Sequence, residues 1–206
     1  YTIPSVGSAE IVGKYRDQIQ QAADKWSRVF LTDYSTSFDV YAGSPGCGGY
    51  VVNIVSTVHV ENILMLVAMR TIDGPGNVIG QAGICAYDAS GKPRIGIIFF
   101  DSADIDKLYN DGRLYYVTLH EMGHVFGIGT MLSSRGLVSG SFLYQGAYGN
   151  QGNLIVGGTG QARVEDTGGA GTARAHWKES VYIEELMTGW SEGPGVKMPL
   201  SIMTLM

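Results

Sequence analysis

The sequence has few charged residues and no long apolar run, and each absence excludes a class of protein. Charged residues make up 16% of the 206 residues, the formal net charge is -5, and Lys and Arg form no cluster. A nucleic-acid surface needs such a basic patch, so we expect no nucleic-acid partner. No apolar stretch approaches the roughly 20 residues that a transmembrane helix requires, so we expect no transmembrane segment.

Cysteine is also scarce, with Cys47 and Cys85 as the two examples. The chain begins at Tyr1, without an initiator Met or a signal-like apolar stretch, which indicates that a leader or pro-segment has been removed. Processing favours export, and two cysteines in an exported protein pair more readily than they stay free. We therefore expect a secreted, extracellular or cell-surface protein, processed from a precursor, with Cys47 and Cys85 as a disulfide candidate.

What is present predicts an α+β protein. Hydrophobic residues make up 45% of the chain, which suits a packed core. Apolar positions recur every three or four residues from Ser8 to Leu31, so this segment is expected to be a helix. Short β-rich runs then alternate with turn residues, and we expect them to form one mixed sheet. These runs are residues 37–41, 50–58, 62–70, 78–87 and 94–101.

The second half of the chain combines another helix with a long Gly-rich region. The pattern predicts a helix from Asn110 to Gly127, with Asn110 or Asp111 available as its cap. Residues 128–175 show no sustained period, and Ser139 to Gly160 is expected to form loops and short hairpins. A short helix at 176–187 and the start of another at 199–206 complete the prediction.

His120, Glu121 and His124 form an HExxH pattern on the second predicted helix. Two histidines one turn apart project to the same side of a helix and can hold one zinc ion, with the glutamate beside them as general base. A catalytic zinc takes three protein ligands and keeps a fourth position for water. We therefore expect His120 and His124 as ligands and look for a third.

The third ligand is sought among the other histidines and the carboxylates that follow. His59 lies in a strand-like run, where a lone histidine is usually a surface or satisfied core residue. His176 follows the Gly-rich region and is the better candidate, because Gly127 lets the helix end sharply and the chain return towards the metal. A downstream carboxylate stays open as an alternative, namely Glu165, Glu179, Glu184 or Glu185.

Four segments together resemble the metzincin peptidases of the leishmanolysin type. They are the HExxHxxG run at 120–127, residues 73–83, residues 168–177 and residues 185–189. The resemblance implies a metzincin-type zincin, with a twisted mixed β-sheet, a backing helix and an active-site helix. Most metzincins place the third histidine where this chain has Thr130. Leishmanolysin-like enzymes insert a segment before the third histidine. The stretch between His124 and His176, which are 52 positions apart, is similar to that insertion.

The resemblance also implies roles outside the histidine pattern. Met187 matches the Met-turn, whose methionine lies beneath the metal site. An edge strand of the sheet pairs with the extended substrate, and small residues there let the partner backbone approach. A catalytic subdomain, 1–127, then carries the sheet and both helices, and a loop-rich C-terminal subdomain, 128–206, carries the insertion, the third histidine and the Met-turn. The expected substrate-binding residues are Ile79, Gly80, Gln81, Ala82 and Gly83.

These residues predict a zinc-dependent endopeptidase that hydrolyses peptides or proteins, with Glu121 as the base that activates water. The alternative is a catalytically inactive zinc-binding protein in which the metal is structural. Asp101, Asp104 and Asp106 form a small acidic cluster that is a candidate site for Ca2+, although such residues more often cap turns and helices. The sequence does not indicate the oligomeric state.

Overall fold

The computed structural model describes residues 9–29, 36–41, 47 and 56–206. These residues form two units, Tyr1–Phe126 and Gly127–Met206. Helices and strands occur together, so the α+β class expected from the sequence is confirmed. None of the described helices is long and apolar enough to cross a membrane.

The described residues of the N-terminal unit form two small β-sheets, not the single sheet that we expected. β1 and β2 form an antiparallel pair, and the other strands form a sheet in the order β3-β5-β4, with β5 parallel to β3 and antiparallel to β4. Residues 50–55 of one predicted strand lie outside the described part of the chain. The elements are α1 (Ala9–Val29), β1 (Phe38–Val40), β2 (Val58–Val60), β3 (Leu64–Arg70), β4 (Gly80–Tyr87), β5 (Pro93–Asp101), α2 (Ile105–Asn110) and α3 (Leu114–Val125).

The two sheets are separate because the β1–β2 pair covers one face of the larger sheet instead of extending its edge. Val40 and Val60 belong to the same buried cluster as alternate residues of β3 and β5. Alternate residues of a strand point to one face, so this cluster fills the space between the β1–β2 pair and the larger sheet. The residues from the larger sheet are Leu64, Leu66, Ile97 and Phe99.

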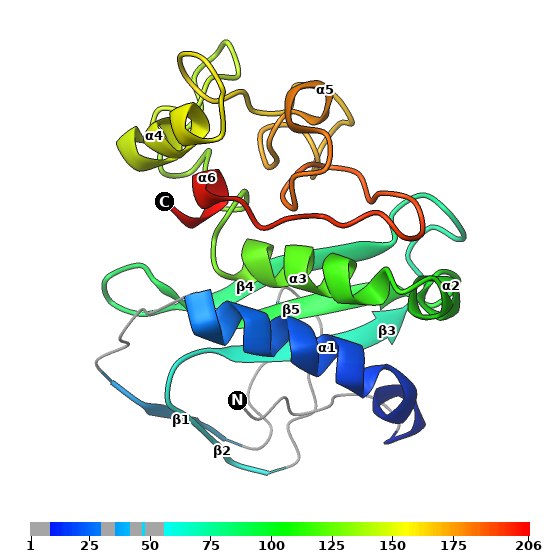
Figure 1. Ribbon diagram of the computed structural model, residues 1–206. Helices are drawn as coiled ribbons and strands as arrows, with labels where there is room; N and C mark the ends of the chain where they lie inside the picture. The colour runs from blue at the N-terminus through cyan, green and yellow to red at the C-terminus, as the bar shows by residue number, and fades with distance from the viewer. Residues whose placement is uncertain (1–8, 30–35, 42–46, 48–55) are drawn as a thin grey trace. The chain divides into compact units, whose positions relative to one another are not determined.

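The opposite face of the larger sheet is covered by helix α3. Ile98 and Phe100 of β5 are fully buried. A Cβ atom built on Gly96 would lie 2.3 Å from Cγ1 of Val125, so the helix packs directly on β5 at this glycine. α1 lies beside α3 (Figure 1), and the indole Nε1 of Trp26 donates a hydrogen bond to the Leu119 carbonyl at 2.9 Å. The sheet and α1 thus hold α3 from two sides.

The helix that the sequence predicts from Asn110 begins later. α2 ends at Asn110, and α3 begins at Leu114. Gly112 lies between them with φ 72°, a backbone conformation that ends a helix. The prediction was wrong on this boundary because the cap residues close α2 instead of opening α3.

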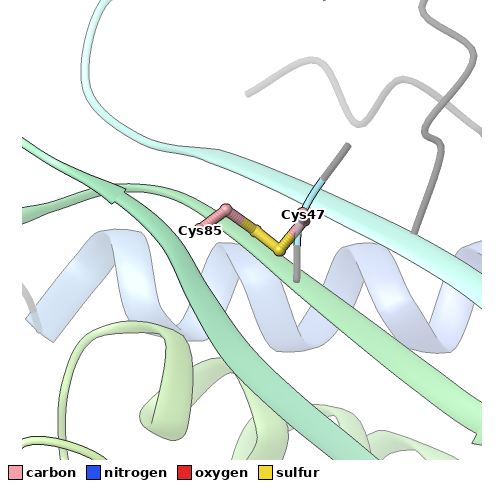
Figure 2. Close-up of a disulfide and its surroundings, with 2 residues drawn as sticks. All are labelled: Cys47 and Cys85. Carbon is pink, nitrogen blue, oxygen red and sulfur yellow. A yellow bond between two sulfur atoms is a disulfide. The ribbon is translucent and has the colours of Figure 1, made fainter. Parts of the chain in front are cut away.

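Cys47 and Cys85 form a disulfide, which joins residue 47 to strand β4. Figure 2 shows the bridge with its two side chains. Cys47 is buried in the apolar cluster between the two sheets, and Cys85 packs against the same cluster. The disulfide therefore lies within the hydrophobic core of the N-terminal unit.

The C-terminal unit consists of short helices joined by loops and isolated β-bridges. Its helices are α4 (Ala147–Ile155), α5 (Glu179–Tyr182) and α6 (Ile202–Leu205). The prediction of loops and hairpins for 139–160 was wrong, since α4 occupies the middle of that stretch. A Cβ atom on Gly152 would lie 2.6 Å from the Met203 Cα, so this glycine lets α4 pack closely on α6. The helix expected at 176–187 is reduced to the single turn of α5.

Candidate metal centre

Helix α3 places His120 and His124 on one side, one turn apart. Their ring centroids are 4.6 Å apart and their planes are nearly perpendicular, at 88°. His124 is buried and His120 is half-buried. The buried Met122 and Val125 hold α3 in the core of the N-terminal unit. Packing of the helix therefore sets the direction of both imidazoles.

His176 lies in the C-terminal unit, where a backbone contact fixes its tautomer. Its Nδ1 is 2.9 Å from the carbonyl oxygen of Thr172. A carbonyl oxygen only accepts, so Nδ1 carries the hydrogen and Nε2 keeps the lone pair that binds a metal. Burial lowers the pKa of His176, although the Thr172 contact and the charge of Glu165 oppose this effect. The neutral imidazole, which is the metal-binding form, is thereby favoured.

Three histidines offer converging ligand atoms. One ring nitrogen from each of His120, His124 and His176 lies within 4.8 Å of those from the other two. Among the residues that the structure describes, no cysteine or carboxylate side chain joins this group. His59 is exposed on β2, where its Nδ1 lies 2.7 Å from Oδ1 of Asp39. The three-histidine group has the donor atoms to hold a metal ion.

Glu121 follows His120 on α3, and its side chain is 5% exposed. Burial raises the pKa of its carboxyl group to about 8. Within the described part of the chain, its Oε2 atom is buried without a hydrogen-bond partner. A buried acceptor without a donor is costly, so such an atom indicates a place where a ligand or water completes the site.

Met187 lies in a tight turn of the C-terminal unit. The amide of Thr188 donates to the Glu185 carbonyl at 3.1 Å, which closes a four-residue turn with Met187 in its third position. Met187 is 1% exposed, and its amide donates to Oε2 of Glu185 at 2.5 Å. Its carbonyl accepts from the amide of Trp177 at 2.9 Å, so the turn is bonded to the residue that follows His176.

The residues expected to bind substrate lie at the start of β4 and just before it. β4 has β5 on one side, and no described strand pairs with its other edge. Gln81 accepts a hydrogen bond from Nη2 of Arg70 at 2.6 Å, whereas the carbonyl of Ile79 accepts from the amide of Asp101 at 3.1 Å. The segment is therefore an ordered sheet edge.

Sequence reasoning missed how the chain before β4 is held. Oδ2 of Asp101 accepts hydrogen bonds from the amides of Ile72, Asp73 and Gly74 at 2.9 to 3.2 Å. The hydrogen bond from the amide of Ala103 lowers the pKa of Asp101 most. The bonds from the three amides above lower it further, although burial opposes them. An acidic residue at the end of an apolar strand is the signal that could have revealed this arrangement, because a charge buried in that place needs hydrogen-bond donors.

The three carboxylates of the calcium hypothesis already have protein donors. Asp101 accepts the amides described above, and Oδ1 of Asp104 accepts the amide of Gly76 at 2.9 Å. Oδ1 of Asp106 accepts from the ammonium of Lys14 and the hydroxyl of Tyr15, both at 2.6 Å. Asp101 and Asp104 thus hold loop amides, whereas Asp106 pairs with side chains of α1.

Two of the alternative carboxylate ligands are engaged inside the C-terminal unit. Glu165 is 2% exposed and accepts hydrogen bonds from the amides of Asp166, Thr167 and Glu179 at 3.0 Å. Glu185 is 6% exposed, and its oxygens accept hydrogen bonds from the amide of Met187 and from the hydroxyls of Ser201 and Thr204. The amide of Ser201 makes a longer contact with the same carboxylate. Both carboxylates therefore act as internal acceptors.

Fold and site together define a mixed α+β protein with a three-histidine group that fits a metal ion. The sequence profile of the leishmanolysin family matches residues 37–137, a segment that includes His120, Glu121 and His124 and ends before His176. A leishmanolysin homolog of Crithidia fasciculata is 26% identical over an alignment of 196 positions, and the match covers 86% of this chain. In sequence the chain is therefore similar to leishmanolysins, and it spans 28% of the length of that relative.

Proposed function

We propose that the chain is a zinc-dependent endopeptidase in which His120, His124 and His176 hold the metal. The observation that carries the proposal is the converging group of three imidazole nitrogens, with a buried glutamate next to one of them in α3. Imidazole is a preferred ligand of zinc, and three protein ligands leave a position for water. The donor set therefore fits a catalytic zinc better than a structural one, which usually takes a fourth protein ligand.

Zinc, when bound, supplies the Lewis acidity that makes a water nucleophilic at neutral pH. Glu121 acts as general base: its carboxylate accepts the water proton and later delivers it to the leaving amine. The pKa of about 8 in the metal-free chain falls when a cation is close, because opposite charge favours the ionised carboxylate. Thr172 orients His176 through the contact at Nδ1.

The substrate in this proposal is an extended peptide that pairs with the outer edge of β4. Residues Gly80 to Gly83 open that strand, and its neighbour β5 occupies the inner edge. Main-chain hydrogen bonds along an edge give affinity for any peptide, and side chains on alternate positions give specificity. The family match and the disulfide support a protein or peptide substrate outside the cell or at its surface. Met187 is proposed as the methionine of the Met-turn.

Elemental analysis for zinc, combined with hydrolysis of casein by the purified chain, tests the proposal. We expect near-stoichiometric zinc and cleavage that 1,10-phenanthroline abolishes. Glu121→Gln should keep the zinc and lose at least about a hundredfold in turnover, the usual contribution of a general base. Glu61→Gln is the matched control, because Glu61 is exposed in the N-terminal unit. If the chain binds zinc but cleaves no casein, and Glu121→Gln leaves the zinc content unchanged, the chain would instead be the inactive zinc-binding protein.

A further inference from the structure

Gly80, the first residue of β4, lies against the side chain of Glu121. A Cβ atom built on Gly80 would be 2.7 Å from Oε1 of Glu121, 3.2 Å from its Cδ and 3.3 Å from its Cγ. The nearest atoms around that position therefore all belong to one side chain. The carboxylate occupies the space that any other residue at position 80 would fill.

The backbone gives no separate reason for glycine at this position. Gly80 does not have the positive φ that strains other residues, and its partner in the sheet register is Phe100 of β5. Alanine could therefore adopt the same conformation. Gly96 offers a contrast on the same sheet, because its missing Cβ makes room for Val125, an apolar side chain of α3. Glycine at 96 lets the helix pack, whereas glycine at 80 makes room for a carboxylate.

We propose that Gly80 is a positioning residue that seats the carboxylate of Glu121. This inference rests on the proposed function, in which Glu121 is the general base. The side chain of Glu121 is 5% exposed, so a methyl group at position 80 leaves it little room to move aside. The closest atom is the far end of a flexible side chain, so the carboxylate shifts first and the backbone of α3 stays in place.

A double-mutant cycle on thermal stability tests the contact without any need for activity. Gly80→Ala should lower the Tm by about 3–6 °C when residue 121 is Glu, the usual effect of overpacking in a chain of this size. In a Glu121→Ala background the same change should cost less than about 1 °C, because the crowded carboxylate is gone. Gly96→Ala is the control: it crowds Val125 and should cost the same in both backgrounds.

Steady-state kinetics then separate positioning from substrate binding. Displacing the base by about an ångström costs on the order of a hundredfold, so Gly80→Ala should lower kcat by about this factor, leave KM within about twofold and keep the zinc. Gly140→Ala, in open space on the surface of the C-terminal unit, should change neither constant. A rise in KM alone, with equal Tm costs in both backgrounds, would overturn the proposal. Absence of cleavage by the unmodified chain would reject the proposed function, while the Tm cycle would still decide whether Gly80 seats Glu121.

Discussion

The carboxylate of Glu185 and the hydroxyl of Thr204 lie 2.5 Å apart in the interior of the C-terminal unit. Thr204 donates this hydrogen bond and at the same time accepts one from the indole Nε1 of Trp177 at 2.8 Å. Glu185 also accepts the amide of Met187. Three parts of the unit are therefore joined through one buried carboxylate: helix α6, the turn that contains Met187, and the segment that contains His176.

Thr204→Val should destabilise the chain by about 2–3 kcal/mol. The substitution keeps the shape of the side chain but leaves the indole N–H of Trp177 without its acceptor and removes one donor from Glu185, and each unpaired buried group costs about 1–3 kcal/mol. Urea unfolding followed by Trp fluorescence measures the change. Thr204→Ser retains the hydroxyl and should cost less than half as much, and equal losses for both variants would show that the hydrogen bonds contribute little.

Glu165 should make the C-terminal unit sensitive to acid. Burial raises the pKa of its carboxyl group, but hydrogen bonds from the hydroxyl of Thr167 and from the amides of Glu179, Thr167 and Asp166 outweigh it and lower the pKa from 4.5 to about 2. The folded chain then binds fewer protons than the unfolded chain between these values. The resulting stabilisation is fully present above pH 4.5 and is lost as the pH falls towards 2.

The loss amounts to no more than about 3.5 kcal/mol, from about 1.4 kcal/mol for each pKa unit. Thermal unfolding of the chain at pH 7, 5, 4 and 3 measures it. Other acidic groups contribute to the same trend, and Glu165→Gln separates them, because an amide at this position does not titrate. A variant whose Tm falls with acid as steeply as that of the unmodified chain would contradict a role for Glu165.

The disulfide between Cys47 and Cys85 should stabilise the N-terminal unit by about 2–4 kcal/mol. It closes a loop with a sequence separation of 38 residues, and a loop of this length restricts the unfolded chain by that order. The doubly substituted Cys47→Ser/Cys85→Ser chain, compared with the oxidised chain by urea unfolding, measures the effect. Reducing agent should lower the stability of the oxidised chain and leave that of the substituted chain unchanged.

Periodicity predicted most of the N-terminal elements but not how the strands pair. The β-rich runs bounded by turn residues placed β3, β4 and β5 within a few residues of their observed ends. It did not show that β1 and β2 form a separate pair, because strand identity is a local property, whereas pairing depends on which faces become buried. Helix α4 was missed for a related reason. Gly149 and Gly152 favour loops, and packing on α6 overrides that preference.

Part of the candidate site could be predicted from residues close together in the sequence, and part depends on contacts between distant segments. His120, Glu121 and His124 follow from a spacing within one helix, which sequence alone reveals. The space that Gly80 leaves for Glu121 depends on how α3 packs on β4, and the contact between Thr172 and His176 depends on the path of a loop. Neither relation has a periodic pattern, so neither is visible before the chain is folded.

Replacement of His176 by Ala tests the third proposed zinc ligand. Changes to groups that merely support a ligand already cost 10- to 100-fold in metal affinity, so loss of a ligand should cost more than about a hundredfold. Zinc content after dialysis, together with titration against a chromophoric chelator, measures this loss. His59→Ala is the control, because His59 is exposed and lies beside Asp39 in the β1–β2 pair. Full retention of zinc by the His176→Ala chain would move the third ligand to a downstream carboxylate. Glu179→Gln and Glu184→Gln would then be the first variants expected to lose the metal, because Glu165 and Glu185 are held by donors inside the C-terminal unit.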